Sequence, residues 1–428
     1  MTRTLSLLII LSLMYFFKGI TAIQPLNPIM EATVVLGFLI LAGYNMGELA
    51  RIIKLPKITG YMLTGLIFSR NFLNLITPQT IQQLQLVDHL ALSLIAFAAG
   101  RELKLSLIRE RAKSIISITI CTVLFCFFSD FLFVYLGSSH FPFLAGLPQK
   151  KILVAAILYG VLAMTKSPVT TIAIIEETDS KGPFTETILG AVLLKDVVVL
   201  VVFAFALSFT QGLLLGQNLI QAGFILPVIW KLFGSLAVGL CTGFIFSLYF
   251  RFVRREPVFF LMVAAFLCAL VAQQLHLEVL LLAMASGFFI ENFSSEGEYF
   301  LSTLKKGAAF IYIIFFTIAG ASIDISAIRQ VWLITLLLIA VRLVSTACGV
   351  YLGSRLVEDF QTIRRYGWLG FINQAGLALV IAKVIAGTFP EYGNEIMATA
   401  LGLIFVTDYL GPPLFKFSLI KSGEAKNV

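Results

Sequence analysis

Asp196 is the residue whose type and position in this chain point most directly to ion chemistry. It lies near the middle of an apolar run from about residue 185 to 208, so its carboxylate is expected deep in a lipid bilayer. A charged group at that depth is costly, and a functional role is the first hypothesis for it. The adjacent Lys195 is also charged. Because consecutive helical residues point about 100° apart, Lys195 must face a different partner.

The apolar run before it, residues 151–176, is interrupted near its centre by Thr165, Lys166, Ser167 and Pro168. Proline lacks a backbone donor and disfavours helix at the residue before it, so we expect a broken or unwound helix here. Half-helix ends, backbone oxygens and the hydroxyls of Thr165 and Ser167 suit a monovalent cation. The hydroxyls could equally satisfy backbone groups that the break frees. A broken helix beside a buried carboxylate predicts an ion-transport site.

The composition is that of a polytopic helical membrane protein. Of 428 residues, 59% are hydrophobic and 13% are charged, and the mean hydropathy is +0.97. Apolar runs of about twenty residues predict helices and exclude a transmembrane barrel, whose strands are shorter. The five cysteines lie in apolar runs and the three histidines are scattered, so no metal site, cofactor or enzyme activity is expected. The net charge of +8 reflects basic loops, and no nucleic-acid partner is expected.

The predicted fold is all-α, with thirteen transmembrane helices between residues 29 and 418. Residues 1–22 form either a signal-like segment or an extra helix, and residues 419–428 form a short tail. Lys and Arg gather in alternate loops, while the opposite loops hold only Arg70, Lys150, Lys151 and Arg329. Because basic loops stay in the cytoplasm, this asymmetry predicts a cytoplasmic C-terminus.

An internal repeat supports this topology. Residues 99–109 (AGRELKLSLIR) recur as residues 319–329 (AGASIDISAIR), and seven predicted spans separate the two copies. An odd number of spans inverts one copy relative to the other, which is a transporter architecture. The repeats would be five-helix units at about residues 58–208 and 279–418. The symmetry predicts a second broken helix, crossing the first, at Asn373, Gln374 and Gly376.

Other charged residues lie near mid-depth in the predicted spans. We expect Arg342 to be a fixed counter-charge, because arginine stays protonated. Lys166 and Asp408 are expected to compensate charge, although Asp408 could instead be a second site. Asp130, Lys231 and Lys383 lie nearer the span ends, where side chains are expected to reach the interface. The set at mid-depth is Lys166, Lys195, Arg342, Asp196 and Asp408.

Three segments resemble motifs of the monovalent cation:proton antiporter superfamily, in its Na+/H+ exchanger-like branch that includes potassium efflux systems. They are residues 55–65 (LPKITGYMLTG), 95–103 (IAFAAGREL) and 315–320 (FFTIAG). The resemblance covers nearly everything after residue 29. It implies two crossing broken helices, an elevator motion and a panel for dimerisation. The family's ion-binding acidic pair falls on Lys195 and Asp196, and the basic residue of a later core helix falls on Arg342.

The chain departs from that pattern at Lys195, where the family often has a carboxylate or an amide, and at Lys166 within the break. A lysine could be held neutral by desolvation, the lysines could partner Asp196 and Asp408 in alternate states, or the substrate could be no simple cation. We expect exchange of Na+ or K+ for protons in a bacterial inner membrane. The alternatives are an anion transporter using Lys166, Lys195 and Arg342, and a membrane sensor or enzyme that does not transport. The expected partners are the cation, protons, lipid, a second copy in a homodimer and a separate cytoplasmic regulatory subunit.

Overall fold

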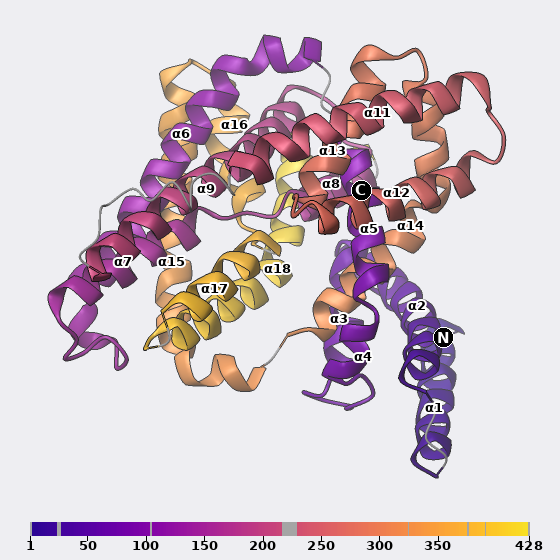
Figure 1. The fold of residues 1–428 in the computed structure, drawn as a ribbon, viewed down its shortest axis with the longest axis horizontal. Coiled ribbons are helices and arrows are strands. Elements are labelled where there is room, and N and C mark those ends of the chain that lie inside the picture. Colours follow the sequence, from indigo (N-terminus) through magenta and orange to yellow (C-terminus); the bar gives the residue numbers. More distant parts are fainter. Residues whose placement is uncertain are drawn as a thin grey trace. The chain divides into compact units, whose positions relative to one another are not determined.

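The computed structural model describes residues 2–23, 27–102, 105–215, 229–323, 325–374, 376–389 and 391–426, and over these residues it is helical without a strand (Figure 1). One isolated bridge joins Ser69 and Ile76. The elements are α1 (Thr2–Ile23), α2 (Pro28–Ile52), α3 (Lys57–Phe68), α4 (Pro78–Gln83), α5 (Gln85–Glu102), α6 (Leu105–Leu136), η1 (Ser138–His140), α7 (Gln149–Met164), α8 (Pro168–Thr178), α9 (Pro183–Leu215), η2 (Trp230–Gly234), α11 (Ser235–Phe252), α12 (Pro257–Gln274), α13 (Val279–Phe293), α14 (Gly297–Ala321), α15 (Ile325–Leu356), α16 (Gln361–Tyr366), η3 (Gly367–Phe371), α17 (Gly376–Thr388) and α18 (Gly393–Ser422).

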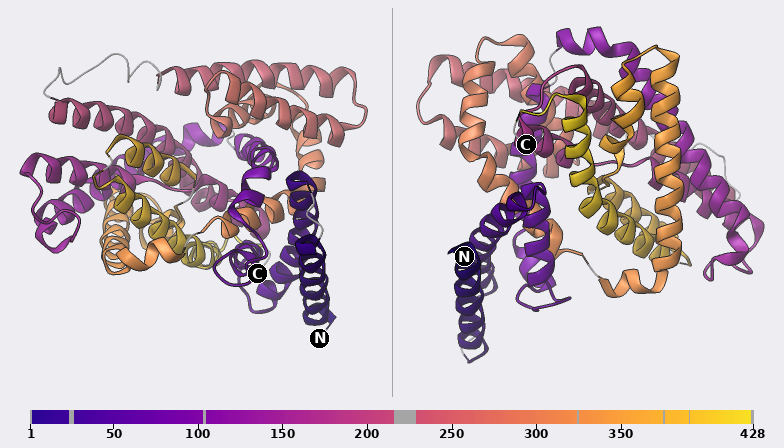
Figure 2. Two further views of the ribbon diagram at one scale, coloured as in Figure 1. Left: turned by 60° about the horizontal axis from the view of Figure 1, so that its bottom comes forward. Right: turned by 180° about the vertical axis from the view of Figure 1, so that it is seen from behind.

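Eight helical segments of the described residues are long and apolar enough to cross a membrane, and the chain is an integral membrane protein. Shorter apolar helices such as Val279–Phe293 accompany them. The all-helical class is therefore confirmed, while the count of thirteen spans stays a prediction. Within the predicted segment 1–22, α1 forms and lies along α2 (Figure 2), where Ile10 and Met14 pack with Val35 and Leu39.

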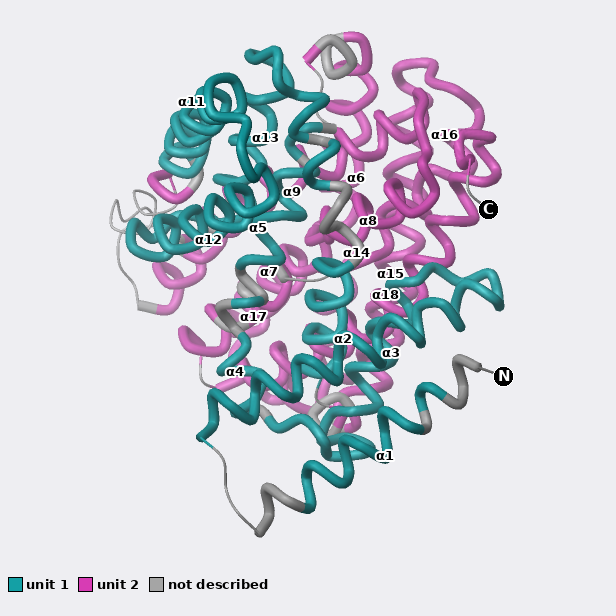
Figure 3. Tube along the Cα trace, turned by 90° about the vertical axis from the view of Figure 1, so that its right-hand side faces the viewer, with its two compact units in different colours: residues 1–104, 233–324 teal, residues 105–232, 325–428 magenta. Residues whose placement is uncertain are grey.

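The chain forms two compact units, each made of two separate stretches (Figure 3). Unit 1 comprises residues 1–104 and 233–324, and unit 2 comprises residues 105–232 and 325–428. Each unit draws on both predicted repeats, so the inverted repeats at residues 58–208 and 279–418 divide the chain differently and stay a prediction. All predicted site residues belong to unit 2.

Glycines allow one helix pair in unit 1, α3 and α14, to touch at their backbones. A Cβ atom on Gly65 of α3 would lie 1.9 Å from the carbonyl oxygen of Thr317 in α14, and one on Gly320 would lie 2.1 Å from that of Met62. Small residues give this close approach between membrane helices. Gly65 and Gly320 belong to the segments that carry the family resemblance, so these motif positions serve packing within unit 1.

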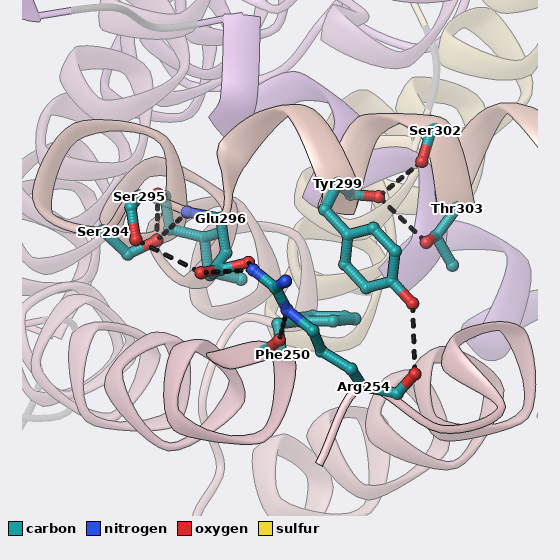
Figure 4. A network of polar contacts seen from close by, with 9 residues as sticks. Phe250, Arg254, Ser294, Ser295, Glu296, Tyr299, Ser302 and Thr303 are labelled. Carbon is teal, nitrogen blue, oxygen red and sulfur yellow. Dashed lines mark hydrogen bonds and ion pairs between the residues drawn. The ribbon is translucent and has the colours of Figure 1, made fainter. Parts of the chain in front are cut away.

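A polar network in unit 1 joins the end of α11 to the start of α14 (Figure 4). The Arg254 guanidinium pairs with the Glu296 carboxylate at 2.9 Å and donates to the Phe250 carbonyl at 3.2 Å. The Tyr299 hydroxyl donates to the Arg254 carbonyl at 3.4 Å. Glu296 precedes α14, so the pair holds the end of α11 and the start of α14 together.

In unit 2, α15 packs against both α6 and α18 (Figure 2). Glycines bring α15 onto α6, since a Cβ atom on Gly349 would lie 2.7 Å from the Thr122 Cα, and one on Gly353 would lie 2.7 Å from the Ile118 Cα. The numbers rise along one helix as they fall along the other, so the pair is antiparallel. The Ser117 hydroxyl continues this contact by donating to the Gly353 carbonyl at 2.7 Å.

The residues after α18 bind the start of α9, the helix that carries Asp196. The Glu424 carboxylate accepts hydrogen bonds from the Phe184 and Thr185 backbone amides, each at 2.8 Å, and from the Thr185 hydroxyl at 2.7 Å. The Lys426 amide donates to the Thr178 carbonyl at 3.0 Å. A carboxylate at a helix N-terminus satisfies free amides and the helix dipole, so Glu424 caps α9 from a distant part of the chain.

We predict that Glu424→Ala lowers the free energy of unfolding by about 1–2 kcal/mol, because it removes this cap. Thermal unfolding of the purified protein in detergent measures the change. Lys426→Ala is the matched control, since its ammonium is exposed and lies 4.0 Å from Asp179, in a surface pair of little worth. Equal unfolding temperatures for the two variants would contradict the assignment of Glu424 as a cap.

Candidate functional site

The helix over residues 151–176 is interrupted between α7 and α8, at the residues where the sequence predicts a break. α7 ends at Met164, Thr165 to Ser167 are non-helical, and α8 begins at Pro168. Proline suits a first helical position, where its missing N–H has no partner to lose. Ser167 caps α8 by accepting from the Thr170 amide at 3.4 Å. The two half-helices therefore present a carbonyl end and a capped amide end within one membrane segment.

A second interruption lies between η3 and α17. η3 ends at Phe371, residues 372–374 are irregular, and α17 begins at Gly376. The predicted break residues Asn373 and Gln374 lie in this segment and are buried. Residue 375 lies outside the described part of the chain. The second break thus falls in the run where the repeat predicts it.

The two interruptions touch each other. The Ser167 amide donates to the Asn373 carbonyl at 3.1 Å. The Gln374 side chain donates to the Leu162 carbonyl and to the Thr165 hydroxyl, each at 2.9 Å. Unpaired backbone groups are costly inside a membrane, and here each break supplies partners to the other. The Thr165 hydroxyl, which also donates to Leu162 at 2.7 Å, is part of this backbone pairing.

Arg342 of α15 binds the carbonyl ends of both broken segments. Its guanidinium donates to Ala163 at 3.1 Å and Thr165 at 3.0 Å on one side, and to Ile372 at 2.6 Å and Phe371 at 3.2 Å on the other. Helix C-termini carry partial negative charge, so the fixed cation compensates both ends at once. The counter-charge that the sequence predicts at Arg342 therefore acts on backbone dipoles, through four hydrogen bonds.

Lys166 and Lys195 share one aromatic ring. The Lys166 ammonium donates to the Gly370 carbonyl and to the Thr171 hydroxyl at 3.2 Å, and it lies 4.7 Å from the Phe371 ring centroid. The Lys195 ammonium lies 5.7 Å from the same centroid and 3.9 Å from the Cys126 sulfur. Both side chains are buried. Cation–π contacts therefore help to hold two positive charges beside the second break.

Asp196 differs from its neighbour Lys195 in exposure, because it is partly exposed while Lys195 is 1% exposed. The two consecutive residues of α9 occupy different surroundings, as the helical geometry requires. Lys195 reaches toward α6 and the second break. Asp196 is the more accessible of the two, and its predicted role in ion binding stays a prediction.

Asp408 of α18 is placed at the second break by its neighbours. The Gln374 backbone amide donates to the Thr407 hydroxyl at 3.3 Å. Asn373 fills the space over Gly411, where a Cβ atom would lie 1.4 Å from its Oδ1. Asp408 is 5% exposed, and its Oδ1 has no hydrogen-bond partner among the described residues. Its predicted role in charge compensation stays a prediction.

Sequence reasoning missed two buried groups of this region. Asp130 of α6 was expected to reach the membrane interface, but it is 3% exposed. Cys126, one turn earlier on α6, was assigned no role beyond lying in an apolar run, yet its sulfur lies 3.9 Å from the Lys195 ammonium. The spacing of Cys126 and Asp130 on one helical face was a signal that could have been used. Lys231 is partly buried, and the side chain of Lys383 lies outside the described residues.

We predict that Arg342→Gln lowers the free energy of unfolding by about 3 kcal/mol, because it leaves buried carbonyl groups without a donor. Arg342→Lys should be intermediate, since one ammonium cannot reach carbonyls on both segments. Arg355→Gln, an exposed site on the same helix, is the matched control. Detergent unfolding curves that coincide for Arg342→Gln and Arg355→Gln would show that the guanidinium does not hold the breaks together.

Comparisons with known proteins agree with this architecture. The chain is 22% identical over 352 residues to a Na(+)/H(+) antiporter of Enterococcus hirae. The aligned region covers 81% of this chain and 88% of the relative. Its fold is similar to that of the sodium proton antiporter MjNhaP1 from Methanocaldococcus jannaschii at pH 8, with a TM-score of 0.70 and 18% identity over 92% of this chain and 99% of that one.

A second structure of that antiporter, from electron microscopy, gives a TM-score of 0.73 at 17% identity over 93% of this chain and 99% of that one. Residues 34–419 match the family described as sodium/hydrogen exchanger, transmembrane. This match spans most of the chain, including both breaks and every residue of the candidate site. The chain therefore belongs to the transmembrane sodium/hydrogen exchanger family.

Proposed function

We propose that this protein is a secondary active transporter that exchanges a monovalent cation, Na+ or K+, for protons, with Asp196 binding the cation and the proton in turn. The observation that carries the proposal is the pair of touching helix breaks whose carbonyl ends are already neutralised by Arg342. Such a crossing places polar groups inside the membrane without a net backbone charge. Family membership and the antiporter relatives support cation:proton exchange.

The division into units supports an elevator mechanism. Asp196, Lys195, both breaks and Arg342 all belong to unit 2, so a single unit carries the whole candidate site. A movement of that unit would transfer a bound ion without taking the site apart. The proposed cation ligands are then the Asp196 carboxylate and the lone pairs of the Thr165 and Ser167 hydroxyl oxygens that pairing and capping leave over, because a hard cation requires oxygen ligands.

The contacts of the cationic side chains argue against the anion-transport alternative. Arg342 donates to four backbone carbonyls, and Lys166 donates to the Gly370 carbonyl and the Thr171 hydroxyl. An anion at the crossing would have to compete with these oxygens for the same N–H groups. The cations instead stabilise the broken backbone, which leaves Asp196 as the charge to which a transported cation is attracted.

The setting in the cell follows from the same proposal. We place the protein in a bacterial inner membrane with its C-terminus in the cytoplasm, where the basic loops would be retained. A homodimer and a separate cytoplasmic regulatory subunit are further parts of the proposal that rest on the family resemblance. The end of α18 bears a Lys416–Glu177 pair at 3.5 Å, which would lie on that cytoplasmic side.

We predict that Asp196→Asn reduces cation-dependent proton flux to the level of empty vesicles while the protein stays folded, because the amide cannot exchange a proton for a cation. Proteoliposomes with an internal pH dye measure the flux with Na+, K+ and Li+, and with chloride gradients for the anion alternative. Asp179→Asn, at the exposed end of α8, is the matched control. Near wild-type flux in Asp196→Asn would refute the site assignment.

The surroundings of Lys195 lead to a prediction about whether exchange moves net charge across the membrane. Its ammonium is buried against a sulfur and an aromatic ring, and we propose that it loses a proton when a cation binds nearby. We expect exchange driven by an imposed membrane potential in the wild type and potential-independent exchange in Lys195→Gln. The exposed Lys421→Gln should behave as wild type. Wild-type rates indifferent to voltage would leave Lys195 with a structural role only.

A further inference from the structure

The packing register of α6 and α15 places Asp130 opposite Arg342. Along this antiparallel pair, Ile118 meets Gly353 and Thr122 meets Gly349. Farther along, the Cys126 sulfur lies 3.4 Å from the Thr346 hydroxyl oxygen and 3.7 Å from that of Ser345. One more turn along α6 reaches Asp130, and one more turn along α15 reaches Arg342. Backbone register therefore brings this carboxylate to the guanidinium that holds the two breaks.

Asp130 and Asp408 lie on different helices and both interact electrostatically with Arg342 without taking its hydrogen bonds. Arg342 is close enough to both carboxylates to interact with them electrostatically, yet its N–H groups donate to carbonyls. Both acids are more than nine-tenths buried. Oδ2 of Asp130 and Oδ1 of Asp408 have no hydrogen-bond partner among the described residues. Each acid thus keeps an oxygen able to carry a proton.

The other titratable groups around them do not supply a hydrogen-bonded counter-ion to these two oxygens. Among the described residues, the elements packed against α6 and α18 are η1, which carries His140, and α7, α8, α9, α15, α16, α17 and η3. The side chain of Lys383 in α17 lies outside the described residues. The titratable and charged groups of the packed elements and of the two helices themselves include Cys126, Tyr159, Lys166, Glu177, Lys195, Asp196, Arg342, Arg364, Arg365, Tyr409 and Lys416.

The balance of charge around Arg342 determines whether Asp130 and Asp408 can both be ionised. Lys166 and Lys195 contact the Gly370 carbonyl, the Cys126 sulfur and the Phe371 ring, whereas Arg342 is the cation that interacts electrostatically with both acids among the described residues. One guanidinium compensates one carboxylate, so two ionised acids around Arg342 leave one buried negative charge. A buried charge without a hydrogen-bonded partner is costly, whereas a protonated carboxyl group is neutral. Removing the excess charge needs one proton for the pair. Two carboxylates that act on a common cation titrate as a pair and not as independent groups.

We propose that Asp130 and Asp408 form a second proton-binding site around Arg342, separate from Asp196, that holds one proton when no cation is bound. Losing this proton at higher pH restores the negative charge and favours a cation at Asp196. The proton is the ligand, and it moves between a carboxylate oxygen and water, so no other reactant is needed. The role in exchange rests on the proposed function, whereas the proton site itself does not.

The single and double variants act in opposite directions under this proposal. Asp130→Asn leaves Asp408 alone with Arg342, and Asp408→Asn leaves Asp130 alone, so the remaining acid stays ionised without a shared proton. Each single variant should shift the pH of half-maximal exchange downward by about one unit. The double variant leaves Arg342 uncompensated and should raise the cation KM about tenfold or more. Asp130→Glu, which keeps the carboxylate, should retain the wild-type pH profile.

Infrared difference spectroscopy tests the site without transport. Titrating the cation-free wild-type protein in detergent should reveal a protonated carboxyl band that disappears as pH rises, and that is absent from both single variants. This band is expected even if the protein exchanges no cation, so the two proposals can fail separately. A wild-type band retained in both Asn variants, or unchanged pH profiles in folded Asp130→Asn and Asp408→Asn, would overturn the second site. If Asp130→Asn does not fold, Asp408→Asn and Asp130→Glu decide the question.

Discussion

The constraint on which unit 2 depends is that backbone groups inside a membrane need hydrogen-bond partners even where a helix is broken. Two breaks free carbonyls at the end of α7 and at the end of η3. The Arg342 guanidinium, with several N–H donors in one plane, binds both sets at once. Gln374 and Ser167 supply the remaining contacts between the two segments. The two breaks are thus joined by hydrogen bonds and are not two independent kinks.

The hydrogen bonding of the two breaks explains why cationic side chains lie in the region where a transported cation is proposed to bind. Lys166 caps η3 through the Gly370 carbonyl, and the Phe371 ring faces both Lys166 and Lys195. The charges are therefore directed at carbonyl ends and at an aromatic face. At mid-depth the sequence predicts three cationic residues, Lys166, Lys195 and Arg342, and two acids, Asp196 and Asp408. The structure adds Asp130 to the acids of this region, so the surroundings of Arg342 are less positive than the sequence suggests.

Local patterns in the sequence were sufficient to locate the breaks, because proline and glycine act on their own backbone. They also indicated Asp196, since a carboxylate in the middle of an apolar run stands out without any knowledge of packing. Partners were harder to predict. Whether Arg342 meets a carboxylate or a carbonyl depends on how α15 lies against α7 and η3, and Asp130 became buried through the register of α6 on α15. Such long-range packing leaves no pattern within a single span, and glycines such as Gly349 and Gly353 become informative only once their opposing backbone is known.

The same packing links the chemistry of the site to its rigidity. Arg342 cannot serve as a mobile counter-ion, because moving its guanidinium would strip hydrogen bonds from both broken segments. On the proposed function, the charge of a cation at Asp196 would be balanced by groups that change protonation and not by movement of this arginine. Lys195 and the acids beside Arg342 are buried groups able to do so, and each lies on a helix packed against α15 or α6. On the proposed function, cation binding and proton release would then be coupled through electrostatics within unit 2, and the proposed movement of the unit would leave the hydrogen bonds between the two breaks intact.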